Sequence, residues 1–258
     1  MTWRDEGFLS YWFTCAEQLN NFIQDTMCSL QVPKDDMQRL LGAVLLARMA
    51  SAFQGVVILS ERGMWTEARY VLRSMLEIVF ILSANAKDPE FYRKHAFRTV
   101  YHHRKMANVI LQIYSTTPPD PGVDVTDLRN KAEQFTAEIE RSGLSDMSVQ
   151  TAAHIGELSW LYDTAYRFLS SATHALVGDL GIHATVDANG VIDKLAWGPN
   201  RDMIPDTLES VCTFSMIGMQ HTIDLFDRQD LGARYAKLWG MMRPLVNVPS
   251  GISHVEGP

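Results

Sequence analysis

The segment Thr66–Ala84 is apolar on almost every side of a predicted helix, yet it carries two charged residues. A helix that is apolar nearly all round must lie near the centre of a helical bundle, because no side of it is suited to water. Arg73 and Glu77 stand one helical turn apart within this segment. Since an unpaired buried charge costs several kcal/mol, we expect these two charges to have polar partners inside the protein. The rest of the chain has to fold around this helix.

Apolar residues recur at helical spacing on both sides of this central segment. The helical segments are separated by Pro33, by the pair Arg62–Gly63 and by a loop at 115–125 that is rich in proline and glycine. The pattern predicts an all-α bundle of about seven to eight helices, in one domain at 1–243 with a flexible tail at 244–258. The other predicted helices lie at about 8–30, 35–61, 88–114, 127–141, 157–176, 204–226 and 231–242, with an irregular stretch or short helix at 142–153.

One short region departs from the helical pattern. Asn189–Gly190 is the strongest hairpin-turn dipeptide in the chain, and Thr185-Val186 and Val191-Ile192 flank it. We expect a small β-hairpin insertion at about 182–197, or a long ordered loop in the same place.

Composition excludes several classes of protein. The net charge is −7, so any surface that binds a polyanion would have to be a local patch. The start of the chain has no basic region followed by an apolar one, and the stretch nearest to a membrane span, at 70–86, is interrupted by Arg73 and Glu77. Cys15, Cys28 and Cys212 are expected to be buried free thiols. These features predict a cytoplasmic protein without a membrane partner.

The sequence also lacks the usual signatures of cofactor and metal sites. There is no phosphate-cradling glycine loop, dinucleotide fingerprint, nucleophile elbow or zinc-binding His-Glu-x-x-His motif. His154 and Glu157, three residues apart, are an isolated pair of candidate metal ligands. A metal ion would need further ligands from elsewhere in the chain. We therefore expect no cofactor and no metal.

A polar stripe on the predicted helix at 157–176 is the most suggestive candidate site. Arg167, Ser170, Ser171 and His174 have the spacing of one helix face, and Asp163 extends it. Arg73 and Glu77 on the central helix are the expected partners of Arg167 and His174. An imidazole at His174 suits proton transfer, and Arg167 could stabilise charge on a phosphate. Ser170 or Ser171 as a nucleophile is a weaker hypothesis, since no acid–base relay is evident. The alternative is a solvent face or a satisfied buried network without chemistry.

The predicted helix at 88–114 carries a local concentration of positive charge. Five Lys or Arg residues and three His lie between Arg93 and Lys105 without an acid among them. Arg98, His102 and Lys105 share one side of the helix, so they could form a basic ridge that attracts phosphates. The alternative is an ordinary solvated helix face.

Two runs of residues carry a resemblance to known families. The runs Ala68–Glu77 and Tyr166–His174 resemble the bacterial family catalogued as domain of unknown function 5677, over about residues 40 to 180. The separation of Arg167 and His174 by six residues resembles the R-x4–6-H motif of the HEPN superfamily. Phe168 stands where the ribonucleases of that superfamily usually have a polar residue.

The HEPN resemblance implies a helical bundle, often a homodimer, that acts on RNA without a metal. His174 would assist attack by the RNA 2′-hydroxyl, and Arg167 would stabilise the charge that develops on the phosphate. The leading hypothesis is therefore a HEPN-like phosphate-handling or RNA-handling protein, with a ribonuclease of the toxin or phage-defence type as its catalytic form. The alternative is a non-catalytic bundle that binds a partner protein or small ligand, with the Arg/His stripe structural. Whether the chain is an enzyme stays open, and the C-terminal helices are a candidate dimer interface.

Overall fold

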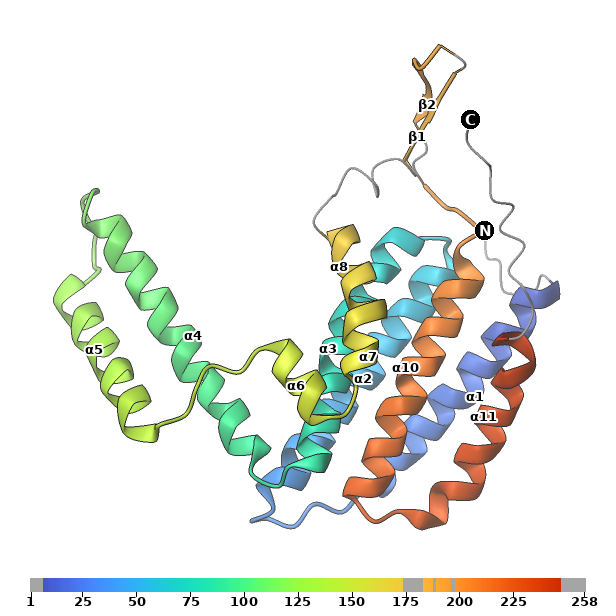
Figure 1. The fold of residues 1–258 in the computed structure, drawn as a ribbon, viewed down its shortest axis with the longest axis horizontal. Coiled ribbons are helices and arrows are strands. Elements are labelled where there is room, and N and C mark those ends of the chain that lie inside the picture. Colours follow the sequence, from blue (N-terminus) through green and yellow to red (C-terminus); the bar gives the residue numbers. More distant parts are fainter. Residues whose placement is uncertain (1–6, 174–182, 188, 196–197, 247–258) are drawn as a thin grey trace.

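The computed structural model describes residues 7–173, 183–187, 189–195 and 198–246, and most of them are helical (Figure 1). The body of the molecule is a bundle of long helices, and a pair of helices projects from it. The long helices are α1 (Gly7–Ser29), α2 (Met37–Glu61), α3 (Trp65–Lys87), α4 (Phe91–Tyr114), α5 (Val125–Ser142), α10 (Ile204–Leu225) and α11 (Gly232–Val246). The shorter elements are α6 (Val149–Ile155), α7 (Ser159–Leu161), the π-helical turn η1 (Tyr162–Tyr166), α8 (Arg167–Thr173) and the 3₁₀ turn η3 (Gln229–Leu231).

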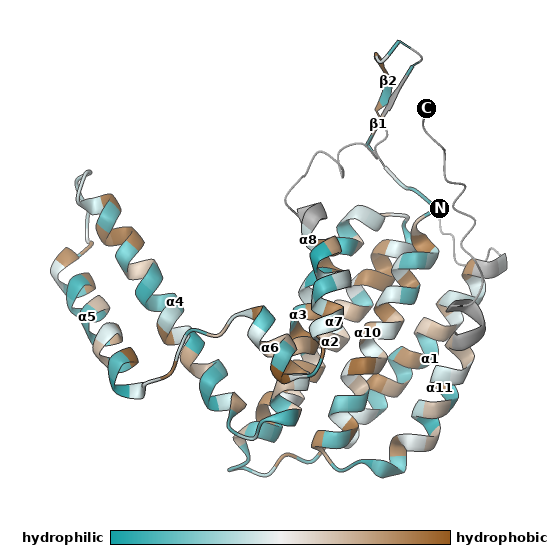
Figure 2. Cartoon of the chain, in the orientation of Figure 1, coloured by the Kyte–Doolittle hydropathy of each residue, from teal (hydrophilic) through white to brown (hydrophobic). Residues whose placement is uncertain are grey.

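The all-α prediction is confirmed, and α3 occupies the central place that its composition predicts. It packs against α2 on one side, α10 on another and α6 and α8 on a third. Figure 2 shows hydrophobic stretches along α3 and α10 within the body. Phe80 from α3 is fully buried, as are Trp12 of α1, Phe53 of α2 and Met219 of α10. Burial of such apolar area is the main force that holds the helices together.

Local signals place most helix ends near their predicted positions. Asp36 caps α2, because its carboxylate accepts a hydrogen bond from the backbone N–H of Arg39 over 2.8 Å. Asp124 caps α5 in the same way, and Gly143 ends that helix in the left-handed conformation at φ 63°. At the far end of the chain α11 continues to Val246.

The helix predicted at 157–176 is the element that departs most from expectation. Glu157 has φ 60° and belongs to a turn, and the helical segment begins at Ser159. Its second part is the π turn η1, which widens the helix by one residue before α8 continues it. Such a local insertion changes which side chains face the bundle.

Two further expectations meet the structure with different outcomes. Strands β1 (Ala184–Val186) and β2 (Ile192–Leu195) pair antiparallel, with Thr185 opposite Lys194. Cys15 and Cys212 are buried, whereas Cys28 is exposed, so the expectation of three buried thiols is wrong for Cys28. Its position near the C-terminal end of α1 lies on the outer side of that helix.

Among the described residues, α2 is the one helix long and apolar enough to cross a membrane by length and composition. The sequence analysis placed the nearest candidate at residues 70–86. However, α2 packs against α3 and α10, and it buries eight residues against the body, including Leu46, Met49 and Phe53. A core helix of a soluble bundle has these properties too.

The helices α4 and α5 form an antiparallel pair that leaves the body, here called the arm (Figure 1). Only the first turns of α4 lie against α2 and α3, whereas α5 packs along α4. The Pro/Gly-containing loop at 115–124 joins the two helices at the tip of the arm. The arm was not predicted, because helix periodicity says nothing about where a helix pair points.

Candidate functional site

Four polar side chains join α3 to the helix that includes η1 and α8. Arg73 donates from Nε to Oγ of Ser170 over 3.0 Å and from Nη2 to the hydroxyl of Tyr166 over 2.8 Å. Its Nη1 lies 3.3 Å from Oε1 of Glu77, and Tyr166 donates to that same oxygen over 2.7 Å. We call Arg73, Glu77, Tyr166 and Ser170 the brace. The guanidinium of Arg73 therefore contacts Ser170 through Nε, Tyr166 through Nη2 and Glu77 through Nη1.

The π turn explains why Tyr166 takes part in the brace. Tyr162 and Tyr166 lie at its two ends with their rings stacked at 5.0 Å, and both contact the ring of Phe80 on α3. Tyr166 is only 8% exposed. The guanidinium of Arg73 also lies 5.0 Å from the centre of the Tyr166 ring, which adds a cation–π contact.

The side chains of the brace are partly buried, and this affects the protonation of Tyr166. Burial, together with the hydrogen bond to Glu77, raises the pKa of Tyr166 to about 12, so its hydroxyl stays protonated at neutral pH. The side chains of Arg73 and Glu77 are 26% and 30% exposed, which leaves only their edges in contact with water. These mutual hydrogen bonds link α3 to α8.

The structure divides the predicted stripe. Ser170 joins Arg73 and Glu77 as expected, but Arg167 does not. Arg167 lies on the outer side, 64% exposed, where its Nη2 is 3.1 Å from Asp163 and its guanidinium stacks over Tyr162. Its expected pairing with Glu77 is wrong, because Tyr166, one residue earlier, occupies that position. His174 lies outside the described residues.

Phe168 also lies on the outer side of α8. It is 63% exposed, and its ring covers the guanidinium of the buried Arg69 at 4.8 Å, with Trp65 at 5.4 Å on the same cation. Phe168 therefore forms an aromatic contact with α3 at the position where the ribonuclease motif usually has a polar residue.

Most of the positive charge on α4 is neutralised locally. Lys105 pairs with Asp146 at 2.7 Å, Lys94 with Asp88 at 2.7 Å, and Arg93 with Glu90 at 2.8 Å. The predicted ridge of Arg98, His102 and Lys105 is thus reduced at its Lys105 end. Within the residues that the structure describes, Arg98 and His102 form no ion pair, which keeps them available to an anion.

A second arginine, which the sequence analysis did not single out, acts on the same histidine as Arg98. The pKa of His95 is lowered first by burial and then by the positive charges of Arg98 on α4 and Arg48 on α2. Over the described ranges, Arg48 has no carboxylate in ion-pair contact, and the buried Nδ1 of His95 has no hydrogen-bond partner. The His95 ring stacks on Phe91. We call Arg48, His95 and Arg98 the cationic corner.

A cavity of about 440 Å³ opens beside the cationic corner, between α2 and α3. Arg48 forms part of its wall, and the hydroxyl-bearing Ser51 and Ser74 stand among apolar side chains. The remaining lining residues are Val44, Ala47, Ala52 and Ile78. Ser74 and Ile78 follow directly after Arg73 and Glu77 in the chain. The cavity and the brace therefore occupy neighbouring faces of α3.

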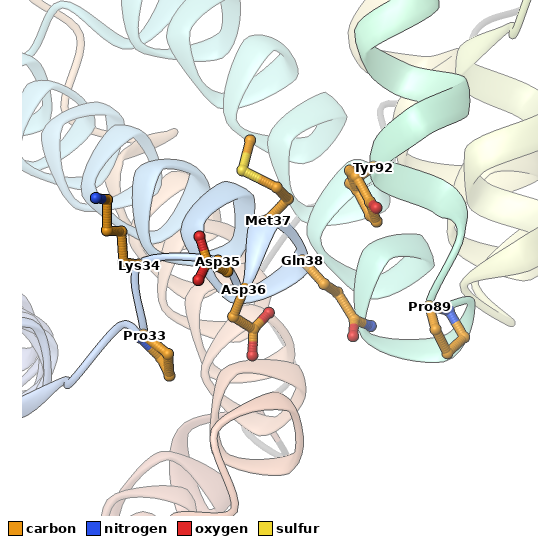
Figure 3. Close-up of a pocket in the computed structure, with 8 residues that line it drawn as sticks. All are labelled: Pro33, Lys34, Asp35, Asp36, Met37, Gln38, Pro89 and Tyr92. Carbon is orange, nitrogen blue, oxygen red and sulfur yellow. The ribbon is translucent and has the colours of Figure 1, made fainter.

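Another cavity, of about 500 Å³, lies where α2 and α4 begin (Figure 3). Figure 3 shows Asp35 and Asp36 on the segment before α2, with Pro89 and Tyr92 contributed by the start of α4. Asp36 is occupied in capping α2 and in an ion pair with Arg39. Gln38 donates to the backbone oxygen of Asn85 over 2.6 Å. Two carboxylates make this cavity unsuited to a phosphate, so the cavity beside Arg48 is the stronger candidate for an anionic ligand.

Metal-ligating side chains do not cluster in the part of the chain that the structure describes: no group of three or more His, Cys, Asp or Glu could hold an ion there. His154 contacts Ser159 at 3.4 Å, and Glu157 pairs with Lys87 at 2.7 Å. His154 and Glu157 therefore take part in two separate interactions.

Comparison with known protein families identifies the family of this chain. The model of a family of unknown function, DUF5677, matches residues 40–191, which is more than half of the chain. The protein belongs to that family. The matched segment runs from α2 to the β-hairpin and contains the brace, the cationic corner and the cavity beside it. No curated protein and no solved structure matches the chain.

Sequence reasoning missed two residues of these sites for different reasons. Tyr166 directly precedes Arg167 in the chain, and no signal in the sequence shows which of the two meets Arg73 and Glu77. Arg48 offered no signal either, because it is an isolated cation on an apolar helix. Its importance comes only from its position beside α4.

Proposed function

We propose that this protein is a HEPN-like helical bundle that binds RNA phosphate groups at the cationic corner, in the cytoplasm and without a cofactor. The observation that carries this proposal is that the positive charges of Arg48 on α2 and Arg98 on α4 both act on the half-buried ring of His95. In a chain of net charge −7, an uncompensated positive centre is unusual. A bound phosphate would offset both of the positive charges that act on the His95 ring.

The cavity beside Arg48 supports RNA as the ligand. Its apolar lining from Val44 and Ile78 suits the flat face of a nucleobase, while Ser51 and Ser74 supply hydroxyls for polar edges. A base in this cavity would place its phosphate near Arg48. Single-stranded RNA presents unpaired bases in this way, whereas a duplex keeps them stacked.

Binding of fluorescein-labelled single-stranded RNA, followed by fluorescence anisotropy, tests this function. Arg48→Ala and Arg98→Ala should each weaken binding by roughly tenfold and lower the slope of log K against log salt by about one. Arg62→Ala, at the far end of α2, is the matched control and should change neither quantity. Equal binding by all four proteins, or none by the unaltered chain, would contradict the proposal.

The catalytic form of this hypothesis is a metal-independent ribonuclease in which His174 moves a proton and Arg167 stabilises the phosphate. Arg167 would then have to leave Asp163, with which it pairs. Incubation with total RNA in EDTA tests this form. Cleavage should be lost in His174→Ala and Arg167→Ala and kept in His154→Ala, a control at an exposed histidine. Cleavage that survives in all three variants would exclude these roles.

The alternative is a non-catalytic bundle that binds a partner protein or small ligand. It is favoured by the brace, because Arg73, Glu77, Tyr166 and Ser170 satisfy one another and leave little for a substrate. Under this alternative, changes in the brace lower the melting temperature, while RNA binding and RNA integrity are unaffected.

A further inference from the structure

Two serine hydroxyls line the cavity between α2 and α3, and the hydrogen of each is already in a hydrogen bond. Oγ of Ser51 donates to the backbone oxygen of Ala47 over 3.1 Å, and Oγ of Ser74 donates to that of Tyr70 over 3.2 Å. A hydroxyl has one hydrogen and two lone pairs, so each oxygen keeps only its capacity as an acceptor. Within the described part of the chain, neither oxygen accepts a hydrogen bond.

The rest of the cavity wall offers a ligand few other acceptors. Val44, Ala47, Ala52 and Ile78 contribute apolar side chains. The backbone of α2 and α3 lies inside continuous helices here, so its polar groups bond to one another. Arg48 is the remaining polar side chain of the lining, and a guanidinium only donates. Under the proposed function, Arg48 binds the phosphate.

The size of the cavity suits a flat ring. Its volume of about 440 Å³ falls within the range of small-ligand sites, and the small side chains of Ala47 and Ala52 keep its wall low on α2. Ser51 belongs to α2 and Ser74 to α3. A ring between the two helices can therefore meet one serine oxygen from each of them.

We propose that this cavity selects nucleobases with an amino group on the Watson–Crick edge, adenine or cytosine, rather than uracil. The amino group of either base has two hydrogens, and it can donate one to Oγ of Ser51 and the other to Oγ of Ser74. This inference rests on the proposed binding of RNA and names its base specificity. Ser51 and Ser74 are its specificity-determining residues.

Uracil is disfavoured because it presents a carbonyl oxygen at the same place. An acceptor that faces two acceptors is repelled unless a serine turns its hydrogen toward the base. That rotation breaks the bond from Ser51 to Ala47 or the bond from Ser74 to Tyr70. Each hydrogen bond of this kind changes affinity by several-fold, so the two together should give a preference of roughly tenfold.

Fluorescence anisotropy with labelled short oligomers of cytidine, adenosine and uridine tests the selectivity. Cytosine and uracil have almost the same size, and at position 4 cytosine has an amino group where uracil has a carbonyl oxygen. We expect the cytidine and adenosine oligomers to bind roughly tenfold more tightly than the uridine oligomer. In the double variant Ser51→Ala/Ser74→Ala this preference should disappear, because affinity for cytidine and adenosine falls while affinity for uridine changes little.

Thr14→Ala is the matched control for the two serine substitutions. Thr14 on α1 is exposed and lies outside the cavity, and its hydroxyl donates to the backbone oxygen of Ser10 over 2.8 Å, four residues earlier as in Ser51 and Ser74. Loss of that hydroxyl should leave the preference unchanged. Circular dichroism checks that the variants keep their helices.

The outcomes separate base selection from RNA binding itself. Equal affinity of the unaltered chain for all three oligomers, still weakened by Arg48→Ala, would overturn the selectivity and leave the proposed RNA binding intact. Binding of none of the oligomers would overturn both. A preference for cytidine that persists in Ser51→Ala/Ser74→Ala would also overturn the inference, because other groups would then distinguish the bases.

Discussion

The hydroxyl of Tyr166 donates a hydrogen bond to Oε1 of Glu77 over 2.7 Å, across the contact between α3 and α8. The same hydroxyl accepts from Arg73, so one phenol links both charges of the central helix to the neighbouring one. Removal of that hydroxyl in Tyr166→Phe should lower the free energy of unfolding by about 1–3 kcal/mol, because two charge-assisted hydrogen bonds are lost. Urea denaturation measures the change. Tyr162→Phe, in the adjacent stacked ring, should cost clearly less.

Alkaline pH should weaken the same contact. The pKa of Tyr166 is raised to about 12 in the folded chain, whereas it is close to 10 in an unfolded one. Its contribution is therefore complete below pH 10 and is lost as the pH rises toward 12, because the unfolded chain gives up the proton first. The fall in melting temperature between pH 10 and 12 should be shallower in Tyr166→Phe. Equal slopes would contradict the placement of this hydroxyl.

A glycine before α7 should tolerate no side chain. A Cβ on Gly156 would overlap Oγ of Ser83 and would lie 3.0 Å from the backbone nitrogen of Ala84, which cannot move away without shifting α3. Gly156→Ala should therefore destabilise the fold by about 1–3 kcal/mol. Gly240→Ala, in α11 with nothing within 4 Å of the added carbon, should stabilise it by about 0.5–1 kcal/mol. Thermal denaturation of both variants distinguishes packing from intrinsic helix preference.

The three cysteines should react in two classes. Burial raises the pKa of Cys15 to about 11 and raises that of Cys212 further, whereas Cys28 is exposed. A thiol reagent such as 5,5′-dithiobis(2-nitrobenzoate) should label one thiol quickly in the folded chain and the other two only after unfolding. Cys28→Ser should abolish the fast phase. A second fast thiol in that variant would show that α1 or α10 is less buried than described.

The existence of the helices could be predicted from sequence because amphipathic spacing is a local property. Arg73 and Glu77 indicated a polar contact inside the protein, because two charges on an apolar helix need partners. The identity of the residue that meets them could not be predicted. Adjacent residues on a helix differ by about 100° in direction, so the choice between Arg167 and Tyr166 depends on where the π turn lies.

The cationic corner could not be predicted from the sequence for a related reason. Arg98 could be recognised in a basic helix, but Arg48 is separated from it by fifty residues of chain. Only the packing of the first turns of α4 against α2 brings their charges to the same histidine. Contacts between distant segments are set by tertiary packing, which periodicity does not encode.

Removal of one charge from the cationic corner should be visible at His95. Since Arg98 lowers the pKa of His95, Arg98→Ala should raise that pKa toward its ordinary value, and Arg93→Ala, whose charge is paired with Glu90, should not. Nuclear magnetic resonance titration of the His95 ring measures both. Because the folded pKa is depressed, His95 also makes the fold less stable as the pH falls below about 6.5, and Arg98→Ala should reduce that loss.

The same titration in the presence of saturating single-stranded RNA tests the central claim most directly. A phosphate bound between Arg48 and Arg98 places negative charge beside the imidazole and offsets the two positive charges that act on it. The account predicts that the pKa of His95 rises when RNA binds and that the rise is absent in Arg48→Ala. A pKa of His95 that stays unchanged while RNA is demonstrably bound would contradict it.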